Sequence, residues 1–206
     1  MKRALVALVL FLLVVSPVWG HDWSAVAKKV KASSFPLMTA SGEIFCTGFI
    51  VDAKRHYGLT AEHCVSGGWV RMGMLVDGKV ADVIRASEDL DVAVLYLPEN
   101  TRPALKPNLG VLYEGIAVAS FGFAREKNLY GHFRVGNLAA VHARIDMLPG
   151  LWVVVDQPFI GGMSGGPVVD TKGRVIAQVQ RSDRALTGIG RSVGEIWRAT
   201  RGYWGH

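Results

Sequence analysis

The chain has few cysteines and few long apolar runs. Its only cysteines are Cys46 and Cys64, so at most one intramolecular disulfide can form. After residue 15, no apolar run approaches the roughly 20 residues that a membrane-spanning helix needs. The histidines other than His63, at positions 21, 56, 132, 142 and 206, follow no recognisable ligand spacing. We therefore expect neither a metal ion nor another cofactor.

Basic residues exceed acidic ones without forming a nucleic-acid motif. The formal net charge of +6 becomes +4 without the first 20 residues, because Lys2 and Arg3 are the only charged residues there. No aromatic-interleaved basic motif accompanies this excess, so we predict a solvated basic face and no nucleic-acid partner. The basic residues late in the chain are Arg174, Arg181, Arg184, Arg191, Arg198 and Arg201.

The N-terminus has the pattern of an export signal. Lys2 and Arg3 precede an apolar run over residues 4–15, and residues 16–20 contain a proline and end in Gly20. The pattern predicts a signal peptide over 1–20, cleaved after Gly20, and a secreted or periplasmic mature chain over 21–206 without stable membrane insertion. An uncleaved anchor is the alternative, although the apolar run is short for one.

Residues 161–167, with the sequence GGMSGGP, place Ser164 between two pairs of glycines. A serine hydroxyl is a poor nucleophile unless a base lies within hydrogen-bond reach, and its attack on a carbonyl needs amide donors for the oxyanion. Glycines before the serine leave such amides unobstructed. An ordinary glycine-rich turn is the alternative interpretation of this segment.

Two further segments supply the groups that such a serine needs. His63 ends a short apolar segment, and Asp91 opens a segment with a buried-strand pattern, DVAVL. A histidine can take the serine proton and return it to the leaving group, while an aspartate orients the imidazole. The order is His, Asp, Ser, with separations of 28 and 73 residues.

These segments resemble the trypsin-like (chymotrypsin-fold) serine peptidases, most closely the bacterial HtrA/Deg type. Residues 60–64 (TAEHC) are similar to the TAAHC block of that family, residues 91–95 to its DIAxL strand, and residues 162–167 (GMSGGP) to GNSGGP or GDSGGP. Residues 46–51 and 135–141 also resemble family strands. The resemblance covers about residues 35–179, most of the predicted mature chain.

The resemblance implies a serine endopeptidase that works through an acyl-enzyme. It assigns Ser164 as nucleophile, His63 as base and then acid, and Asp91 as the residue that orients His63. The amides of Gly162 and Ser164 would form the oxyanion hole. Asp89 is a rival to Asp91, but only Asp91 is followed directly by the strand that the family pattern requires. Protein or peptide substrates would be the partners.

The resemblance also locates the substrate sites and a disulfide. No acidic residue lies where the pocket would form, so we predict cleavage after small or medium apolar residues. Cys46 and Cys64 match paired cysteines of many trypsin-like enzymes, and an exported chain would keep that bridge beside His63. The pocket residues would be Pro158, Phe159 and Ile160, and the substrate would pair with the strand containing Gln178, Val179 and Gln180.

Met163 is the clearest departure from the family pattern. Trypsin has an acidic residue at this position, which pairs with a new N-terminus, and the HtrA/Deg group usually has asparagine. Methionine can form no such ion pair, so we expect no zymogen switch of the trypsin kind. The 186 residues that follow Gly20 suit one protease domain without a PDZ module.

Two other functional classes fit parts of this pattern. A binding protein on the same fold would retain the shape without the activity. An esterase or other acyl hydrolase would place its serine in a G-x-S-x-G elbow, which residues 162–166 match literally. Such enzymes have the order Ser, Asp, His and a helix after the serine, whereas here the order is reversed and a strand is predicted.

Short apolar segments separated by turns predict an all-β fold, with barrels or sandwiches of antiparallel strands. The resemblance implies two six-stranded antiparallel barrels. The first would cover about residues 35–98 and the second about 108–191, joined by the proline-containing linker 98–107. Predicted strands include 69–75, 133–135 and 138–145, and Asp77-Gly78 predicts a hairpin turn. The periodic spacing of apolar residues predicts a short C-terminal helix over about 192–201, with the last residues as a tail.

Overall fold

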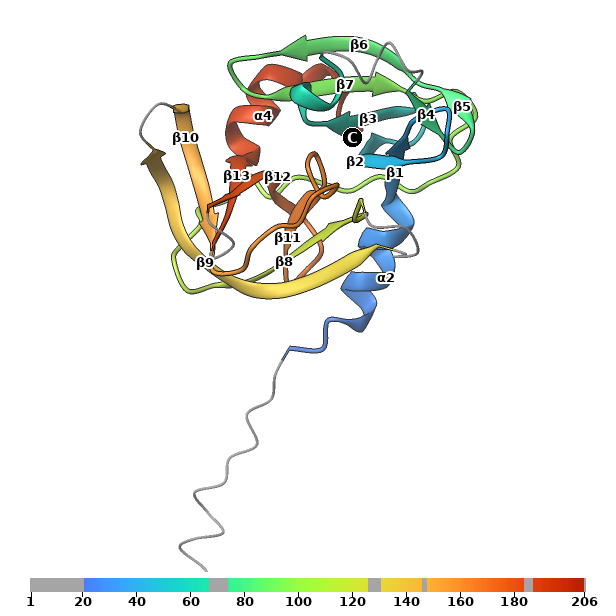
Figure 1. Ribbon diagram of the computed structural model, residues 1–206. Helices are drawn as coiled ribbons and strands as arrows, with labels where there is room; N and C mark the ends of the chain where they lie inside the picture. The colour runs from blue at the N-terminus through green and yellow to red at the C-terminus, as the bar shows by residue number, and fades with distance from the viewer. Residues whose placement is uncertain (1–20, 67–73, 126–130, 146–147, 184–186, 206) are drawn as a thin grey trace, which may run out of the picture.

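The computed structural model describes residues 21–66, 74–125, 131–145, 148–183 and 187–205. The predicted signal peptide, residues 1–20, lies outside the described residues. Figure 1 shows a β-sheet stacked on a β-barrel, with one helix near the start of the described chain and one near its end. The all-β, chymotrypsin-like prediction is confirmed.

The first half is a seven-stranded sheet in the order β5-β4-β1-β2-β3-β7-β6, with every pair antiparallel. The prediction of a closed six-stranded barrel is therefore wrong for the described residues of this half, which form an open sheet. Most of the predicted strand 69–75 lies outside the described residues. The strands are β1 (Ser34–Met38), β2 (Ile44–Asp52), β3 (Tyr57–Thr60), β4 (Leu75–Val76), β5 (Lys79–Val80), β6 (Asp82–Ser87) and β7 (Val92–Tyr96).

The second half is a closed barrel in the order β10-β13-β12-β11-β8-β9, as predicted. Where two strands were predicted over 133–145, one 14-residue strand forms, because Gly136 and Asn137 stay in register with β8 instead of turning. The strands are β8 (Ala117–Gly122), β9 (His132–Ile145), β10 (Leu148–Val155), β11 (Pro167–Asp170), β12 (Val175–Asp183) and β13 (Thr187–Ser192).

The predicted C-terminal helix is present as α4 (Val193–Thr200), followed by the 3-10 turn η2 (Arg201–Tyr203). Helix α2 (Ser24–Ser33) was not predicted. Its only buried residues are Val26, Val30 and Ser33, so its sequence carries too weak an apolar period to reveal it. None of the helices in the described part of the chain is both long and apolar enough to cross a bilayer.

The C-terminus is part of the core, which corrects the expectation of a tail. Trp204 is buried, and its ring centroid lies 6.5 Å from that of Phe49 in β2. Its indole Nε1 donates a 3.0 Å hydrogen bond to Thr200 Oγ1. Tyr203 packs against Tyr57, with the two ring centroids 5.3 Å apart. The chain end therefore closes the sheet half of the molecule.

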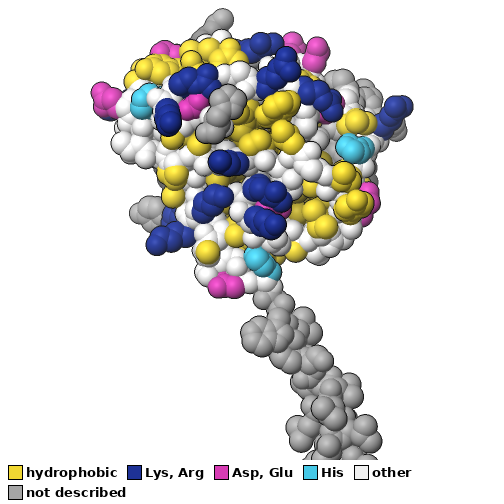
Figure 2. Space-filling model, turned by 180° about the vertical axis from the view of Figure 1, so that it is seen from behind, with side chains coloured by type: hydrophobic (Ala, Val, Ile, Leu, Met, Phe, Trp, Pro, Cys, Tyr) yellow, Lys and Arg dark blue, Asp and Glu magenta, His cyan; other side chains and the backbone are white. Residues whose placement is uncertain are grey.

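The Asp77-Gly78 turn joins β4 and β5, as predicted, with φ values of 52° and 77°. Two positive φ values in succession are what a two-residue hairpin of this kind requires. On the face seen in Figure 2, lysine and arginine side chains are spread among hydrophobic ones rather than gathered in one stripe. This spread agrees with a solvated basic face.

Candidate active site

His63 and Asp91 lie side by side in the sheet half. His63 is carried by the 3-10 turn η1 (Glu62–Cys64), which follows β3, and Asp91 directly precedes β7. The imidazole Nδ1 lies 2.8 Å from Asp91 Oδ2 and 3.0 Å from Oδ1, and Oδ1 also accepts the His63 backbone N–H at 2.9 Å. The carboxylate therefore holds both the ring and the backbone of His63.

The Asp91 carboxylate is kept ionised by these contacts. Burial by itself would raise the pKa of Asp91. Hydrogen bonds from His63, with the nearby positive charges of His63 and Arg181, outweigh that effect and hold the pKa below its usual value. Asp91 also has a φ of 49°, in the left-handed region that few residues other than glycine adopt.

Ser164 lies in the loop between β10 and β11, on the barrel half. Its hydroxyl donates a 3.2 Å hydrogen bond to the Gln180 carbonyl. The hydrogen bonds of the described residues do not include one between Ser164 and His63. Catalytic hydrogen bonds are often long or misaligned without substrate and tighten when it binds. In this structure the Ser164 hydroxyl is directed to the Gln180 carbonyl.

Thr47 in β2 fixes the serine loop to the sheet half. Its backbone N–H donates to the Ser164 carbonyl at 2.9 Å, and its hydroxyl donates to the Gly162 carbonyl at 2.8 Å. The same hydroxyl accepts the Phe123 N–H at 2.8 Å. With both carbonyls turned toward Thr47, the amides of Gly162 and Ser164 donate to no acceptor on the described residues.

The glycine after the serine lets the loop approach β2 and β3 closely. Gly165 has a φ of 84°, and a Cβ there would lie 2.3 Å from the Thr47 carbonyl oxygen and 2.6 Å from the Ala61 amide nitrogen. Both atoms belong to backbone, so neither can move aside cheaply. Glycine at this position is a condition for bringing the two halves of the site together.

Met163 points away from this surface. Its side chain is fully buried in the barrel's apolar cluster, which includes Val118, Leu138 and Val155. The serine loop is thus anchored on one side by Thr47 and on the other by an apolar side chain in the core. Met163 stands at the position where trypsin has an acidic residue and the HtrA/Deg group usually has asparagine.

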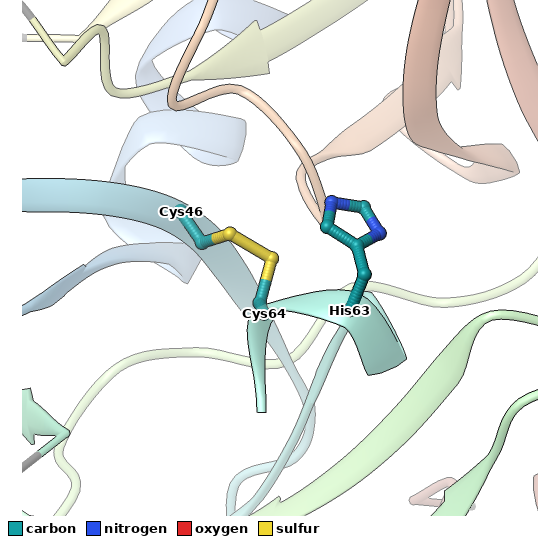
Figure 3. A group of neighbouring side chains, drawn as sticks. All are labelled: Cys46, His63 and Cys64. Atoms are coloured by element: carbon teal, nitrogen blue, oxygen red, sulfur yellow. A yellow bond between two sulfur atoms is a disulfide. The ribbon is translucent and has the colours of Figure 1, made fainter. Parts of the chain in front are cut away.

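The expected disulfide joins Cys46 in β2 to Cys64 in η1, with a Cα–Cα distance of 6.1 Å. Figure 3 shows the His63 ring beside this bridge, with His63 and Cys64 on the same short turn. His63 and the two sulfurs offer metal-ligand types within 4.8 Å of one another. Because the sulfurs are bonded to each other, they are not available as thiolate ligands.

The predicted pocket segment lies beneath the serine loop. Phe159 is buried, whereas Pro158 and Ile160 are half-buried. A Cβ on Gly188 would lie 2.5 Å from the Phe159 ring, so the ring rests against the backbone of β13.

The structure changes the expectation for the substrate strand. Val179 already bonds the serine loop, through Gly165 N–H to its carbonyl and its own N–H to the Gly166 carbonyl. Gln178 pairs with Pro167 in β11 and with Arg191 in β13. The backbones of Gln178 and Val179 are therefore already paired, which corrects the expectation that they bind a substrate strand. Gln180 is the first residue of the three that has no pairing partner in β11.

Three residues of the site were missed or misread in the sequence. Thr47 lies in a segment with the pattern of an ordinary strand. The sequence predicts only a substrate-pairing role for Gln180. Arg191 was grouped with the surface cations, yet it is 1% exposed. No local pattern distinguishes these residues, because the partners that place them in the site lie far away along the chain: Gly162 is 115 residues from Thr47, Asp91 is 89 residues from Gln180, and Leu90 is 101 residues from Arg191.

Comparison with protein families matched residues 46–177 to the trypsin-like peptidase domain. A search among curated proteins gave no match. The active form of the Rv3671c protease from M. tuberculosis has a TM-score of 0.70 and 20% identity, covering 86% of this chain and 83% of that chain. The serine endoprotease from Yersinia pestis has a TM-score of 0.73 and 18% identity, covering 89% and 67%.

The HtrA-type protease AlgW, solved with a tripeptide, has a TM-score of 0.69 and 17% identity. The match covers 87% of this chain but only 63% of AlgW. Structural similarity at these low sequence identities establishes a shared fold. The family match covers most of the chain and includes His63, Asp91 and Ser164.

Proposed function

Because the chain belongs to the trypsin-like peptidase domain family, and is thereby a serine-type endopeptidase, we propose that it cleaves peptide bonds through a His63–Asp91–Ser164 triad. The observation that carries this proposal is the paired hydrogen bonding of His63 and Asp91 on one half of the molecule, opposite a Ser164 loop held by Thr47. The three residues come from three different segments of the chain.

In the proposed reaction, Ser164 Oγ attacks the scissile carbonyl carbon while His63 Nε2 takes the hydroxyl proton. The oxyanion is stabilised by the free amides of Gly162 and Ser164, each donor of this kind being worth a few kcal/mol. His63 then gives its proton to the leaving amine, and the C–N bond breaks to form an acyl-enzyme. Water, deprotonated by His63, releases the acyl group and restores Ser164.

Specificity for small side chains before the scissile bond is supported by Phe159, whose ring occupies the space against Gly188. We expect Phe159→Ala to extend cleavage to larger apolar residues, with Leu37→Ala, at a fully buried residue of β1 in the sheet half, as the control that leaves the preference unchanged. Mass spectrometry of products from a peptide library measures this. An unchanged preference in Phe159→Ala would place the pocket elsewhere.

Substrate pairing would use the edge of β12 that begins at Gln180 and continues to Arg181, since the preceding two residues are already paired. An added substrate strand gains main-chain hydrogen bonds at such an edge. Export to an oxidising compartment after cleavage at Gly20 is the proposed location, and the Cys46–Cys64 disulfide supports it.

The test is digestion of casein or mixed peptides by the mature, oxidised protein beside Ser164→Ala, with mass spectrometry of the cleaved bonds. We expect cleavage by the first and none by the variant, because removal of the hydroxyl removes the nucleophile. A fluorophosphonate probe should label only the unmodified protein. Absence of both cleavage and labelling in the folded protein would favour a binding module on this fold.

A further inference from the structure

Arg191 is a buried arginine that reaches from the barrel half to the sheet half. It lies in β13, and its side chain is 1% exposed. Its Nε donates to the Leu90 carbonyl at 3.1 Å and its Nη2 to the Asp89 carbonyl at 3.1 Å. Asp89 and Leu90 are the two residues before Asp91. One guanidinium therefore binds two successive carbonyls of the turn that leads into Asp91.

The rest of the Arg191 side chain is held within the barrel half. Its guanidinium carbon lies 3.8 Å from the centre of the Trp152 ring, and its Nη1 lies 3.3 Å from Glu195 Oε2 in α4. A Cβ on Gly150 would lie 2.2 Å from Nη1, so a larger residue there would displace the guanidinium. A planar guanidinium stacked and paired in this way has one defined orientation.

Gln180 binds the third carbonyl of the same turn. Its side-chain Nε2 donates to the Asp91 carbonyl at 2.8 Å and also to Gln178 Oε1 at 3.1 Å. Gln180 is 3% exposed, and its main-chain carbonyl accepts the Ser164 hydroxyl. The residue that contacts the nucleophile thus also contacts the backbone of Asp91.

We propose that Arg191 and Gln180 form a carbonyl clamp that fixes the backbone of residues 89–91 and thereby aims the Asp91 carboxylate at His63. The inference rests on the proposed function, in which Asp91 orients His63. Both clamp residues act through Asp91 and are positioning residues. The clamp also sets where the sheet half lies relative to the barrel half that carries Ser164.

The backbone of Asp91 explains why a clamp is needed. A φ of 49° is unfavourable for a residue with a Cβ, and such conformations persist only where surrounding contacts hold them. Release of the three carbonyls would let residue 91 relax toward a common conformation. Its carboxylate would then move from His63, which it now contacts at both the ring and the backbone.

The test compares Arg191→Met, Arg191→Lys and Gln180→Leu with the unmodified protein, using the peptide cleaved fastest in the casein digest. We expect Arg191→Met to lower kcat on the order of 100-fold, as small displacements of catalytic groups do, with KM changed far less. Arg191→Lys should recover part of kcat, since an ammonium can reach one carbonyl. Gln180→Leu should lower kcat by removing the hydrogen bond to the Asp91 carbonyl, together with the one to Gln178 Oε1, while the Arg191 bonds remain.

Proton NMR gives a readout that a loss of stability alone would not change. The Nδ1 proton of an imidazole bonded to a carboxylate resonates far downfield, and this signal should weaken or vanish in Arg191→Met and Gln180→Leu. Val153→Ala is the control: it removes buried apolar volume from β10 without contacting residues 89–91, so it should lower stability while keeping both the signal and kcat.

Asp91→Asn separates the two proposals. If Asp91→Asn keeps full activity, the proposed triad is wrong. A loss of activity in Asp91→Asn, by up to about 10⁴-fold, would support the triad. If the clamp variants then fold and keep both kcat and the downfield signal, the clamp is overturned while the triad stands. Should Arg191→Met fail to fold, Gln180→Leu and Arg191→Lys decide the same question.

Discussion

At the scale of single residues, the serine loop depends on an apolar anchor. Met163 is fully buried among barrel side chains, and a Cβ on Gly122 would lie 2.7 Å from its Cα, so the loop backbone sits directly against the end of β8. An apolar side chain here is desolvated at no electrostatic cost and needs no partner charge. The loop is therefore held on this side by apolar packing.

This predicts that Met163→Ala lowers the free energy of unfolding by about 2–5 kcal/mol, as a cavity in the core would, and lowers activity with it. Met163→Leu, which nearly conserves volume, should cost less than about 1.5 kcal/mol. Chemical denaturation followed by tryptophan fluorescence measures both. Equal stability of the alanine variant and the unmodified protein would show that Met163 does not anchor the loop.

Asp91 gives a prediction about pH. Because its pKa is lower in the folded chain than in the unfolded one, its ionised form stabilises the fold above the unfolded pKa, and that contribution is lost as pH falls through the folded value. The stability advantage over Asp91→Asn should therefore shrink between roughly pH 5 and pH 2. Urea denaturation at several pH values tests this, and a constant difference would contradict it.

At the scale of elements, the disulfide connects β2 to η1 and so restrains two parts of the site together. Cys46 lies next to Thr47, which holds the serine loop, and Cys64 lies next to His63. The bridge closes a loop with a sequence separation of 18 residues. Loss of the disulfide would affect both the stability of the sheet and the position of His63.

We expect the Cys46→Ala/Cys64→Ala double variant to lose about 3 kcal/mol of unfolding free energy, from the loop entropy that the bridge removes. Its kcat should fall as well, because η1 is then held by fewer restraints. Reduction of the unmodified protein should reproduce both effects, and the double variant should not respond to reductant. Full activity after reduction would show that β3 alone positions His63.

At the scale of the whole molecule, the chain end completes the fold. Trp204 joins a core cluster that draws residues from α2, both halves and α4. Arg55 adds hydrogen bonds from the sheet half to the Gly202 and Trp204 carbonyls. The segment after α4 therefore ties the barrel half back to the sheet half.

Trp204→Ala is expected to cost about 3–5 kcal/mol, which corresponds to a drop in Tm on the order of 10 °C for a chain of this size. Calorimetry of the mature protein measures it. Trp197→Ala, a half-buried tryptophan of α4, is the matched control and should cost less. A small effect at Trp204 would mean that the C-terminus behaves as the tail that its sequence indicated.

The sequence was sufficient for the all-β class, the Asp77-Gly78 hairpin and α4, because these features depend on local periods and turn residues, which a single segment displays. The closed second barrel was expected from the resemblance of several motifs to a known family, not from any single segment. The sequence was not sufficient to predict α2, because too few of its residues are buried to give a clear apolar period. It was also not sufficient to predict β9 as one continuous strand, because Gly136 suggested a break. Strand pairing with β8 decided β9, and packing on the barrel decided α2.

By itself, the sequence determined which chemical groups are present and in what order: a histidine, an aspartate, a glycine-flanked serine and two cysteines. Only the tertiary structure decided that Arg191 is buried rather than a surface cation, and that the side chains of Met163 and Phe159 lie in the core of the barrel half. The reason is physical. Burial and hydrogen-bond partners arise from segments far apart in the chain, and an arginine has the same local sequence pattern whether it faces solvent or, like Arg191, binds the carbonyls of Asp89 and Leu90 on the other half of the molecule.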